Sequence, residues 1–441
     1  MIISGRPNPP PLWSAPEIAE AVNGRIIKWG RPGSISTDTR TLHPGQWFLP
    51  LVGQNFDAHN FITPQLSAKG AVGVISNQVC ENWDKGLIQV DDSTSDSLQK
   101  LAIFARKRFN GCLIGLTGSV GKTTTRTMIA LALESIGSVY QSPENWNNDI
   151  GVALSLVGIP RNLRILSLEE VSTAKGEILR DALPGDVCVL NADDPLVMSL
   201  PVPEVVEKVL FGRRQGSDVR LVAAQSVDGG LKVEVVLDNN EDTVKFVIPS
   251  PGLHLALNAC AAAAVATSLG VPLALVGKSL SQFIPVPGRS ELEITRNDIK
   301  IINDVYNASP VSTKCAIDSL RAIDCYGKRV AILGDMLELG PTEIKLHELT
   351  LQHCLDSCID VVALVGTRFL AAAENLKVDL EINLVGAYDS ESLASKILEY
   401  VDCGDVVLVK GSRGMKMEKI VHVIKPMFEQ SMPETFRDLH R

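Results

Sequence analysis

The stretch 115–125 constrains this 441-residue chain more than any other. It reads Gly-Leu-Thr-Gly-Ser-Val-Gly-Lys-Thr-Thr-Thr, with a short apolar run at 112–114 before it and a helix-forming run at 126–133 after it. An apolar strand, a glycine-rich loop, Gly-Lys-Thr and a helix, in this order, are the context expected of a phosphate-binding loop. Backbone N–H groups of such a loop, together with the helix N-terminus, bind phosphate oxygens. The sequence therefore predicts an ATP site on an α/β domain.

Within this loop, seven residues are candidate nucleotide ligands: Gly118, Ser119, Val120, Gly121, Lys122, Thr123 and Thr124. Lys122 is also a catalytic candidate, because it would contact the β- and γ-phosphates, and the Thr123 hydroxyl is a candidate ligand of Mg²⁺. Leu116 occupies the position, five residues before Gly121, at which the usual pattern has glycine. The alternative interpretation is a helix N-cap turn that contains Gly-Lys-Thr by chance. The flanking strand and helix favour the phosphate loop.

Composition narrows the class of protein. The length predicts about three domains, and 45% hydrophobic with 21% charged residues is typical of a soluble globular chain. A net charge of −9 argues against nucleic acid as a partner. Nine cysteines without Cys-x-x-Cys spacing fit a reducing compartment. The sequence contains neither a transmembrane stretch nor the apolar core of a signal peptide, so we expect a soluble intracellular protein without membrane partners.

The N-terminal region, 1–110, is expected to be a small α/β domain with strands at 71–75 and 87–90 and a helix that begins at 57 and ends near 69. Its polar loop can bind a phosphorylated ligand through Ser36, Thr37, Asp38, Thr39 and Arg40. A capped turn of the same composition is the alternative.

The middle region, 111–289, follows the phosphate loop with an asparagine-rich segment in which Asn147 and Asn148 are candidate ligand contacts. Side-chain amides both donate and accept hydrogen bonds, but they also build turns, and both interpretations stay open. Residues 168–178, which include Lys175, are predicted to be helical. An antiparallel section at 219–248 and an alanine-rich helix at 259–269 complete the region.

The C-terminal region alternates strands, at 300–302, 329–333, 361–365 and 405–409, with helices at 312–323, 344–358 and 390–400. This alternation predicts a doubly wound parallel sheet. Polar loops at 303–307, 334–340 and 410–413 follow three of the strands, so they should share one edge of the sheet and form a ligand site. Because no Gly-x-Gly-x-x-Gly follows the first strand, a dinucleotide is not expected.

These motifs, in this order, resemble the Mur ligase family over nearly the whole chain. The segment 117–124 matches the family's own phosphate loop, which accounts for Leu116. The segment 145–151 resembles the family signature Asn-x-Asn-Asn-x-Ile-Gly. The segments 333–340 and 410–413 are characteristic of the branch that joins D-alanyl-D-alanine to UDP-N-acetylmuramoyl-tripeptide.

The resemblance implies roles for individual residues. Lys175 would be a carbamylated catalytic lysine that bridges a magnesium ion, Asn258 would contact adenine, and Arg289 and Asp304 would contact the nucleotide. Substrate-binding positions would be Ser36, Thr37, Asp38, Thr39, Arg40, Asn147, Asn148, Asp335, Glu338, Lys410, Ser412 and Arg413.

The resemblance also implies an α/β fold of three domains: a UDP-sugar-binding domain at 1–110, a P-loop ATPase-like domain at 111–289, and a Rossmann-like dipeptide-binding domain at 290–441. The cofactors would be ATP and Mg²⁺. The substrates would be UDP-N-acetylmuramoyl-tripeptide and D-Ala-D-Ala, joined through an acyl phosphate. We expect a monomer in the cytoplasm or, alternatively, in the plastid stroma.

One departure from the family stands out. Family members have a strand ending in Glu-x-Gly, whose glutamate binds magnesium, and later an Ala-His-Leu segment that supplies a histidine ligand. Here 159–164 runs almost directly into 167–170, as if a block of strand, helix, strand and loop were absent. Glu169 or Glu170 could replace the missing carboxylate, although both align better with exposed positions of the helix that carries Lys175.

Three hypotheses follow from this departure. The chain is an active ligase with other metal ligands; or it is an ATP-binding variant with impaired catalysis, a variant transcript or a faulty gene model; or it is a different P-loop enzyme, such as a folylpolyglutamate-type ligase or a small-molecule kinase. The branch motifs at 334–340 and 410–413 count against the third hypothesis.

Overall fold

The computed structural model of the chain describes residues 12–53, 55–78, 80–142, 146, 148–161, 163–169, 178–180, 182–227, 230–238, 242–295, 297–377 and 383–427. The chain forms two compact units, Met1–Ala182 and Leu183–Arg441. Each unit combines helices with largely parallel or mixed sheets, so the predicted α/β class is confirmed.

The first unit begins with a five-stranded sheet of order β1-β5-β4-β3-β2. Its strands are β1 (Arg25–Lys28), β2 (Ile35–Ser36), β3 (Trp47–Phe48), β4 (Gly73–Ser76) and β5 (Gly86–Gln89). Only β1 runs antiparallel to its neighbour. The strands predicted at 71–75 and 87–90 are β4 and β5. The helix predicted to begin at 57 is instead a 3₁₀ turn (Ala58–Phe61) followed by α2 (Pro64–Ala68), because Pro64 starts a new helix at its first turn.

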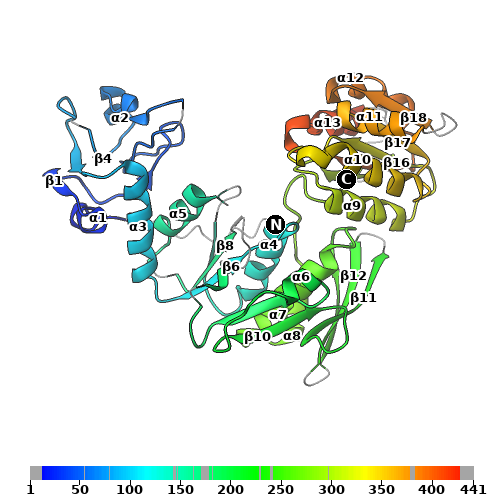
Figure 1. The fold of residues 1–441 in the computed structure, drawn as a ribbon, viewed down its shortest axis with the longest axis horizontal. Coiled ribbons are helices and arrows are strands. Elements are labelled where there is room, and N and C mark those ends of the chain that lie inside the picture. The colour runs from blue at the N-terminus through cyan, green and yellow to red at the C-terminus, as the bar shows by residue number, and fades with distance from the viewer. Residues whose placement is uncertain are drawn as a thin grey trace, which may run out of the picture. The chain divides into compact units, whose positions relative to one another are not determined.

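Helices α1 (Ala15–Val22), α3 (Thr94–Arg108) and α5 (Asp149–Val157) pack together in this unit (Figure 1). Ser14 and Glu17 form a capping box at the start of α1, and Asn23 ends that helix in the left-handed conformation. The core under these helices is built around Trp13, Trp47 and Leu101 and includes Ala153 and Val157 of α5. Although α5 follows the phosphate loop in sequence, it is therefore part of the same hydrophobic core as the N-terminal sheet.

The phosphate loop belongs to a three-stranded parallel sheet of order β6-β8-β7. It consists of β6 (Cys112–Leu116), β7 (Val139–Gln141) and β8 (Ile165–Glu169), with α4 (Lys122–Leu133) after the loop. The prediction of a helix over 168–178 is wrong for Leu168 and Glu169, which end β8. Backbone pairing with Gly115 and Leu116 of β6 stabilises the extended conformation of these two residues and overrides the local helical preference. Residues 170–177, with Lys175, lie outside the described residues.

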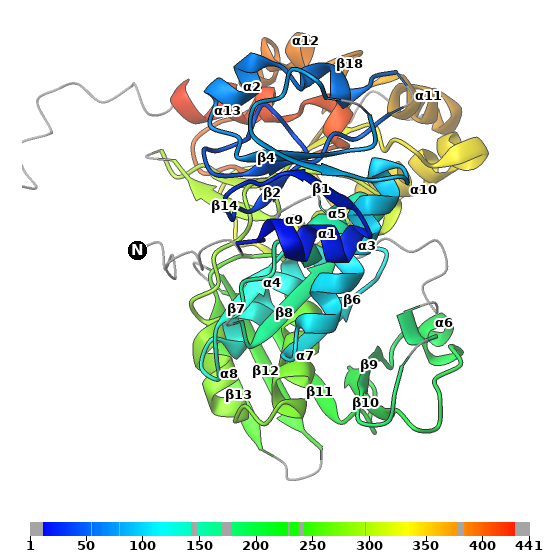
Figure 2. The same ribbon diagram turned by 90° about the vertical axis from the view of Figure 1, so that its left-hand side faces the viewer.

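The second unit starts with a five-stranded sheet of order β13-β12-β11-β10-β9. Its strands are β9 (Val187–Asn191), β10 (Glu207–Gly212), β11 (Val219–Val227), β12 (Gly230–Leu237) and β13 (Thr243–Ile248). Strands β11 to β13 are antiparallel, as predicted for 219–248. The alanine-rich helix α7 (Leu255–Ser268) packs on β10 and β11, and Figure 2 shows α8 (Leu273–Leu280) beside it. Small side chains let α7 lie close to the sheet.

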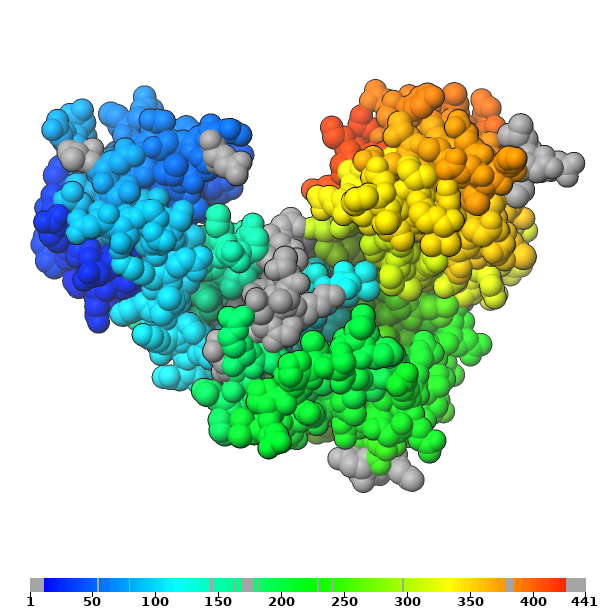
Figure 3. All heavy atoms as spheres, viewed as in Figure 1, coloured from blue at the N-terminus to red at the C-terminus, as the bar shows by residue number. Residues whose placement is uncertain are grey.

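The C-terminal sheet has the order β14-β15-β19-β16-β17-β18 and is parallel except for its edge strand β14. Its strands are β14 (Glu291–Ile294), β15 (Lys300–Asp304), β16 (Arg329–Gly334), β17 (Val361–Val365), β18 (Asn383–Ala387) and β19 (Val406–Lys410). The residues of this sheet and its helices form the yellow-to-red body of Figure 3. Two hydrophobic clusters cover its two faces, as a doubly wound sheet requires.

The helices of this sheet are α9 (Pro310–Ala322), α10 (Glu343–Leu355), α11 (Thr367–Leu376), α12 (Ser390–Ala394) and α13 (Glu418–Met427). The predicted helix 390–400 is too long, because α12 ends at Ala394 and a separate 3₁₀ turn covers Ile397–Glu399. Within the described part of the chain, none of the helices combines the length and the apolarity needed to cross a membrane.

Candidate functional site

The phosphate loop connects β6 to α4 with the predicted geometry. Gly121 is the N-cap of α4 and has φ +79°, a left-handed conformation that favours glycine. Lys122 begins the helix, and its Nζ donates a hydrogen bond to the Gly118 carbonyl at 2.8 Å. The N-terminal end of a twelve-residue helix thus follows a tight glycine turn, an arrangement whose backbone N–H groups and helix dipole favour an anion.

The side chains after Lys122 are largely enclosed. Thr123 is 4% exposed and Thr124 is 7% exposed, whereas Val120 lies on the surface of the loop. Arg126, one turn into the helix, is buried and donates from Nη1 to the Ser142 hydroxyl at 2.6 Å. The first turn of α4 is therefore held firmly against β7, which keeps the phosphate-binding end in place.

Strand β8 lies directly beside the strand that leads into the loop. Its backbone register pairs Ile165 with Cys112 and Glu169 with Leu116, so β8 ends level with the start of the loop. Ser167, in the middle of β8, is fully buried and its hydroxyl has no hydrogen-bond partner among the described residues. An acidic residue thus ends the strand next to the phosphate-loop strand, a place where P-loop proteins hold a magnesium ligand.

The polar loop of the N-terminal sheet is a self-contained turn. The Ser36 hydroxyl accepts from the Asp38 N–H at 3.3 Å, and the Asp38 carboxylate accepts from the Arg40 guanidinium at 2.7 and 3.0 Å. The hydrogen bond from Arg40 lowers the pKa of Asp38. Thr39 supplies its carbonyl to Lys69, and Thr37 lies between these residues. The Arg40 side chain stays exposed and accessible to a ligand.

Asn148 caps α5, because its side-chain oxygen accepts the Gly151 N–H at 2.8 Å. This geometry uses its carbonyl oxygen for turn building, one of the two interpretations of the asparagine-rich segment. Asn147 lies outside the described residues.

In the second unit, the loops that follow β15 and β19 meet. The Lys410 Nζ lies 2.6 Å from the Asp304 carboxylate and 2.9 Å from the Asn307 carbonyl. Lys410 is 2% and Asp304 9% exposed. The other oxygen of Asp304 accepts the Ser290 N–H at 3.1 Å. Two residues that are far apart in sequence, and that the sequence analysis assigned to different ligands, therefore form one buried ion pair.

Tyr306 lies close to Asp304 of this pair in sequence, and two arginine side chains contact its ring. The Arg289 guanidinium carbon lies 3.9 Å from the ring centroid, and that of Arg413 lies 5.3 Å from it. The sequence places Tyr306 in a predicted ligand loop but assigns it no role. Its position two residues after Asp304 could have marked it as a site residue.

Asn258 lies on α7, one helical turn after His254, and its side-chain nitrogen is buried without a hydrogen-bond partner among the described residues. The His254 ring is 3.5 Å from the Ser290 hydroxyl, and burial lowers the pKa of His254. Residues i and i+4 share one helix face, so Asn258 lies on the side of α7 that meets the segment containing Arg289. The motif Gly-x-His-x-x-x-Asn at 252–258 could have identified His254 as well.

The side chains of the loop after β16 mainly bind other parts of the protein. Both Asp335 oxygens accept backbone N–H groups of α11, from Phe369 at 2.9 Å and Arg368 at 3.1 Å, and the side chain is 1% exposed. The Ser412 hydroxyl accepts the Leu337 N–H at 2.8 Å and thereby joins the loops after β16 and β19. Glu338 is exposed, in the left-handed conformation with φ +63°. Of these predicted contacts, Glu338 is the one whose side chain faces solvent.

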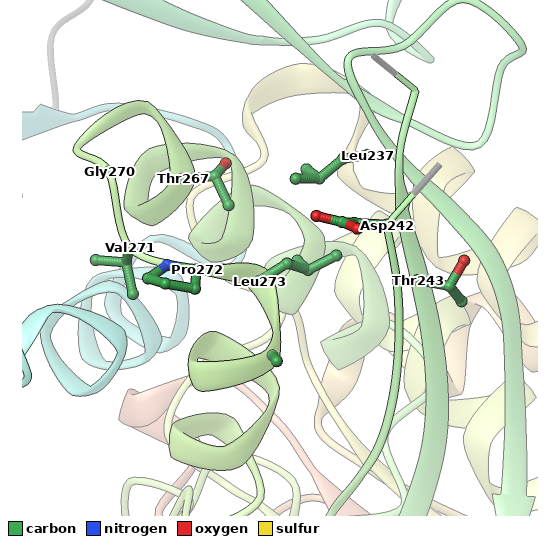
Figure 4. A pocket seen from close by; sticks show the side chains of 9 residues that line it. Leu237, Asp242, Thr243, Thr267, Gly270, Val271, Pro272 and Leu273 are labelled. Carbon is green, nitrogen blue, oxygen red and sulfur yellow. The ribbon is translucent and has the colours of Figure 1, made fainter. Parts of the chain in front are cut away.

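Elsewhere in this unit, a pocket of about 370 Å³ lies between the end of the β12–β13 hairpin and the turn from α7 to α8 (Figure 4). Its lining includes Leu237, Thr243, Thr267 and Leu273. It contains none of the predicted site residues.

We next ask whether the described residues provide ligands for a magnesium ion. Among the residues that the structure describes, His, Cys, Asp and Glu do not gather in any group of three that could hold a metal. A nucleotide-bound Mg²⁺ needs only one or two protein oxygens, because phosphates and water supply the rest. The Thr123 hydroxyl, in the first turn of α4, is such a donor. The donor set fits a metal carried by a nucleotide and not one held by protein alone.

Comparisons with known proteins agree with this geometry. The family model for the Mur ligase middle domain matches residues 116–169 and 164–266, and the model for the Mur ligase glutamate ligase domain matches residues 288–413. A UDP-N-acetylmuramoyl-tripeptide–D-alanyl-D-alanine ligase from Bacillus subtilis is 33% identical, with 88% of this chain and 92% of that protein aligned. The chain belongs to the Mur ligase family.

Solved Mur ligases have the same fold. MurF from Acinetobacter baumannii has a TM-score of 0.83 at 25% identity, covering 95% of this chain and 100% of that one. MurF from Thermotoga maritima, solved in complex with ADP, has a TM-score of 0.75 at 25% identity, covering 91% of this chain and 99% of that one.

The middle-domain match is split where the sequence predicts a missing block. Residues 164–169 match the family model twice, at the end of the first piece and at the start of the second. The alignment with the Bacillus relative spans 421 residues but uses 88% of 441, or about 388, so this Mur ligase lacks about 33 aligned positions. In the structure, all but the first of the twice-matched residues form the single strand β8 (Ile165–Glu169).

Proposed function

We propose that this chain is an ATP-dependent ligase that joins D-alanyl-D-alanine to UDP-N-acetylmuramoyl-tripeptide in peptidoglycan precursor synthesis. The observation that carries the proposal is the alignment of nearly the whole chain with the Bacillus subtilis protein of that name. The phosphate loop before α4 supports the ATP dependence, as does a family neighbour solved with ADP.

The proposed reaction has two steps. An oxygen of the tripeptide's terminal carboxylate attacks the γ-phosphorus of ATP, and the bond to the β-phosphate oxygen breaks, which gives an acyl phosphate and ADP. The amino group of D-Ala-D-Ala then attacks the acyl carbon, loses a proton and displaces inorganic phosphate. Both steps move negative charge, so positioned cations supply much of the catalysis.

In the first unit, Gly118, Ser119, Val120, Gly121, Thr123 and Thr124 would surround the phosphates with backbone N–H groups. Lys122 would leave the Gly118 carbonyl, which it contacts at 2.8 Å, and donate to the transferred phosphoryl. The UDP-sugar would be bound by Ser36, Thr37, Asp38, Thr39 and Arg40. The exposed Arg40 guanidinium is the group suited to hydrogen-bond the diphosphate. Asn147 and Asn148 would contact the peptide substrate.

In the second unit, Asn258 would donate its unpartnered amide to the adenine, and Arg289 and Asp304 would bind the rest of the nucleotide. Lys410, Ser412 and Arg413 would bind and orient the dipeptide, together with Glu338 and Asp335. Asp335 would act through the loop that it anchors to α11, because its own oxygens are occupied.

Magnesium, when bound with ATP, would neutralise phosphate charge and polarise the γ-phosphoryl group. The Thr123 hydroxyl and a carbamylated Lys175 would hold it. A carboxylate at Glu169, the residue that ends β8 beside the phosphate-loop strand, is the further candidate suggested by backbone position.

A second candidate, an ATP-binding variant with impaired catalysis, is favoured by one observation. The chain lacks about 33 aligned positions, and its middle domain matches in two overlapping pieces. The family has its magnesium-binding glutamate and histidine in the block that is missing here. Loss of a metal ligand would cost several kcal/mol of transition-state stabilisation.

One experiment separates the two candidates. ADP release is measured with UDP-MurNAc-tripeptide and D-Ala-D-Ala over a range of Mg²⁺ concentrations, and ADP binding is measured by calorimetry on the same preparation. Release that requires both substrates supports the active ligase. ADP binding without release supports the impaired variant, and glutamate-dependent turnover on a folate would contradict the peptidoglycan assignment altogether.

We further propose that the chain acts as a monomer in the cytoplasm or plastid stroma, without nucleic-acid or membrane partners. The net charge of −9 supports the absence of nucleic-acid binding.

A further inference from the structure

Three segments that are distant in sequence meet at the ring of Tyr306. Arg289 precedes β14, Tyr306 follows β15, and Arg413 follows β19. Both guanidinium carbons lie within the range of a cation–π contact, at 3.9 Å for Arg289 and 5.3 Å for Arg413. One half-buried aromatic ring therefore fixes the positions of two cations.

The backbone around this ring is tied down on both sides. The Tyr306 N–H donates to the Gly288 carbonyl at 3.0 Å, which joins the ring's loop to the segment of Arg289. Lys410 holds Asp304 and the Asn307 carbonyl, two residues before Tyr306 and one after it. Backbone and side-chain hydrogen bonds thus hold the segment that carries the ring, and both guanidinium groups lie against that ring.

In the part of the chain that the structure describes, no carboxylate forms an ion pair with either arginine at the ring. Asp304 is already shared by Lys410 and the Ser290 N–H. The Arg289 Nε is buried without a hydrogen-bond acceptor. Two like charges on one ring repel each other, and a buried guanidinium N–H without an acceptor is unfavourable. An oxyanion that accepts from both guanidinium groups would remove both penalties.

We propose that Tyr306 is a positioning residue whose ring holds Arg289 and Arg413 as a two-arginine clamp for an oxyanion of the bound ligands. This inference rests on the proposed function, in which two ligands carry such an oxyanion: the nucleotide through its phosphates and D-Ala-D-Ala through its carboxylate. The clamp would bind an oxyanion of either kind, and the experiment distinguishes a phosphate of the nucleotide from the carboxylate of the dipeptide.

The test uses the full chain with two probes, Mg·ADP and D-Ala-D-Ala, each measured by calorimetry. Tyr306→Ala removes the ring and is expected to raise Kd for at least one probe by about 5- to 30-fold, the effect of losing two cation–π contacts. Tyr306→Phe keeps the ring and should restore binding to within about threefold of wild type. Tyr326→Ala is the matched control, because that tyrosine is 94% exposed.

A double-mutant cycle separates positioning from a general structural effect. Arg413→Gln removes one arm of the clamp, and adding Tyr306→Ala to it should cost less than Tyr306→Ala costs alone, because part of the ring's effect passes through Arg413. A thermal melt of each variant verifies folding, and Tyr306→Leu replaces the alanine variant if the latter unfolds.

The outcomes are distinct. A larger Kd for Mg·ADP assigns the clamp to phosphate, and a larger Kd for D-Ala-D-Ala assigns it to carboxylate. Unchanged binding of both probes in Tyr306→Ala, or full additivity with Arg413→Gln, overturns the clamp alone. If wild-type protein binds neither probe, the proposed function fails together with the clamp.

Discussion

The buried pair of Lys410 and Asp304 allows a quantitative prediction. Lys410→Met keeps the length and most of the apolar volume of the side chain but removes the ammonium group. The Asp304 carboxylate, which is largely buried, then loses the partner at 2.6 Å and keeps only the Ser290 N–H at 3.1 Å. Removing one member of a buried ion pair costs about 3–5 kcal/mol, because the other charge is left without compensation.

The magnitude can be measured as a melting temperature. For a unit of this size, each kcal/mol shifts Tm by roughly 2–4 °C, so Lys410→Met should lower the Tm of the second unit by roughly 6–20 °C. Asp304→Asn in the Lys410→Met background removes the stranded charge and should recover at least about half of the loss.

Lys328→Met is the matched control for Lys410→Met. Lys328 forms an ion pair with Asp402 at 2.9 Å in the same unit, but the two side chains are 38% and 73% exposed. A surface pair of this kind contributes about 0–1 kcal/mol. If Lys410→Met destabilises the unit no more than Lys328→Met does, or if the double variant is no more stable than Lys410→Met, the assignment of a buried, mutually dependent ion pair is wrong.

Three further predictions concern the loop, the metal and pH. Gly121→Ala places a Cβ at φ +79° and should destabilise the loop by about 1–2 kcal/mol and weaken ADP binding, measured by calorimetry. Glu169→Gln should reduce the strengthening of ADP binding by Mg²⁺ by about tenfold while leaving metal-free ADP binding within about twofold. Burial lowers the pKa of His347, so the unfolded state takes up more protons below about pH 6.5, and the free energy of unfolding should fall as the pH drops below that value; His347→Gln should flatten this fall in urea titrations.

Each of these has a result that counts against it. Equal ADP affinity in Gly121→Ala and wild type would mean that the left-handed turn is not needed for the phosphate site. An unchanged magnesium dependence in Glu169→Gln, compared with Glu134→Gln at the far end of α4, would remove Glu169 from the candidate ligands. A pH dependence of stability that is the same with and without His347 would mean that another group, such as His254, is responsible.

Much of the fold followed from local patterns. The apolar strand, the glycine turn and the helix around Lys122 were predictable because each is encoded within a few neighbouring residues. The parallel C-terminal sheet was predictable for a similar reason: its buried strands are continuous runs of Val, Ile, Leu and Ala, separated by helices of ordinary length. The two edge strands were missed: β14 (Glu291–Ile294) is short and half polar, and β18 (Asn383–Ala387) begins with asparagine and contains glycine.

Side-chain partners were harder to predict. The sequence placed Asp335, Ser412 and Lys410 in loops at one edge of a sheet, but gave no indication that Asp335 anchors α11 or that Lys410 is paired with Asp304. Such partners are chosen by contacts between residues that are distant in sequence, so they depend on the order of the strands in the sheet.

The phosphate loop and residues 164–169 show the difference between what local sequence determines and what tertiary contacts determine. The sequence by itself determined the loop, since the turn into α4 needs the left-handed backbone conformation that glycine at position 121 adopts readily. Only the tertiary structure decided Leu168 and Glu169, which the sequence assigned to the start of a helix. Pairing with β6 makes them the end of strand β8, and the register that sets Glu169 opposite Leu116 brings this end beside the start of the phosphate loop.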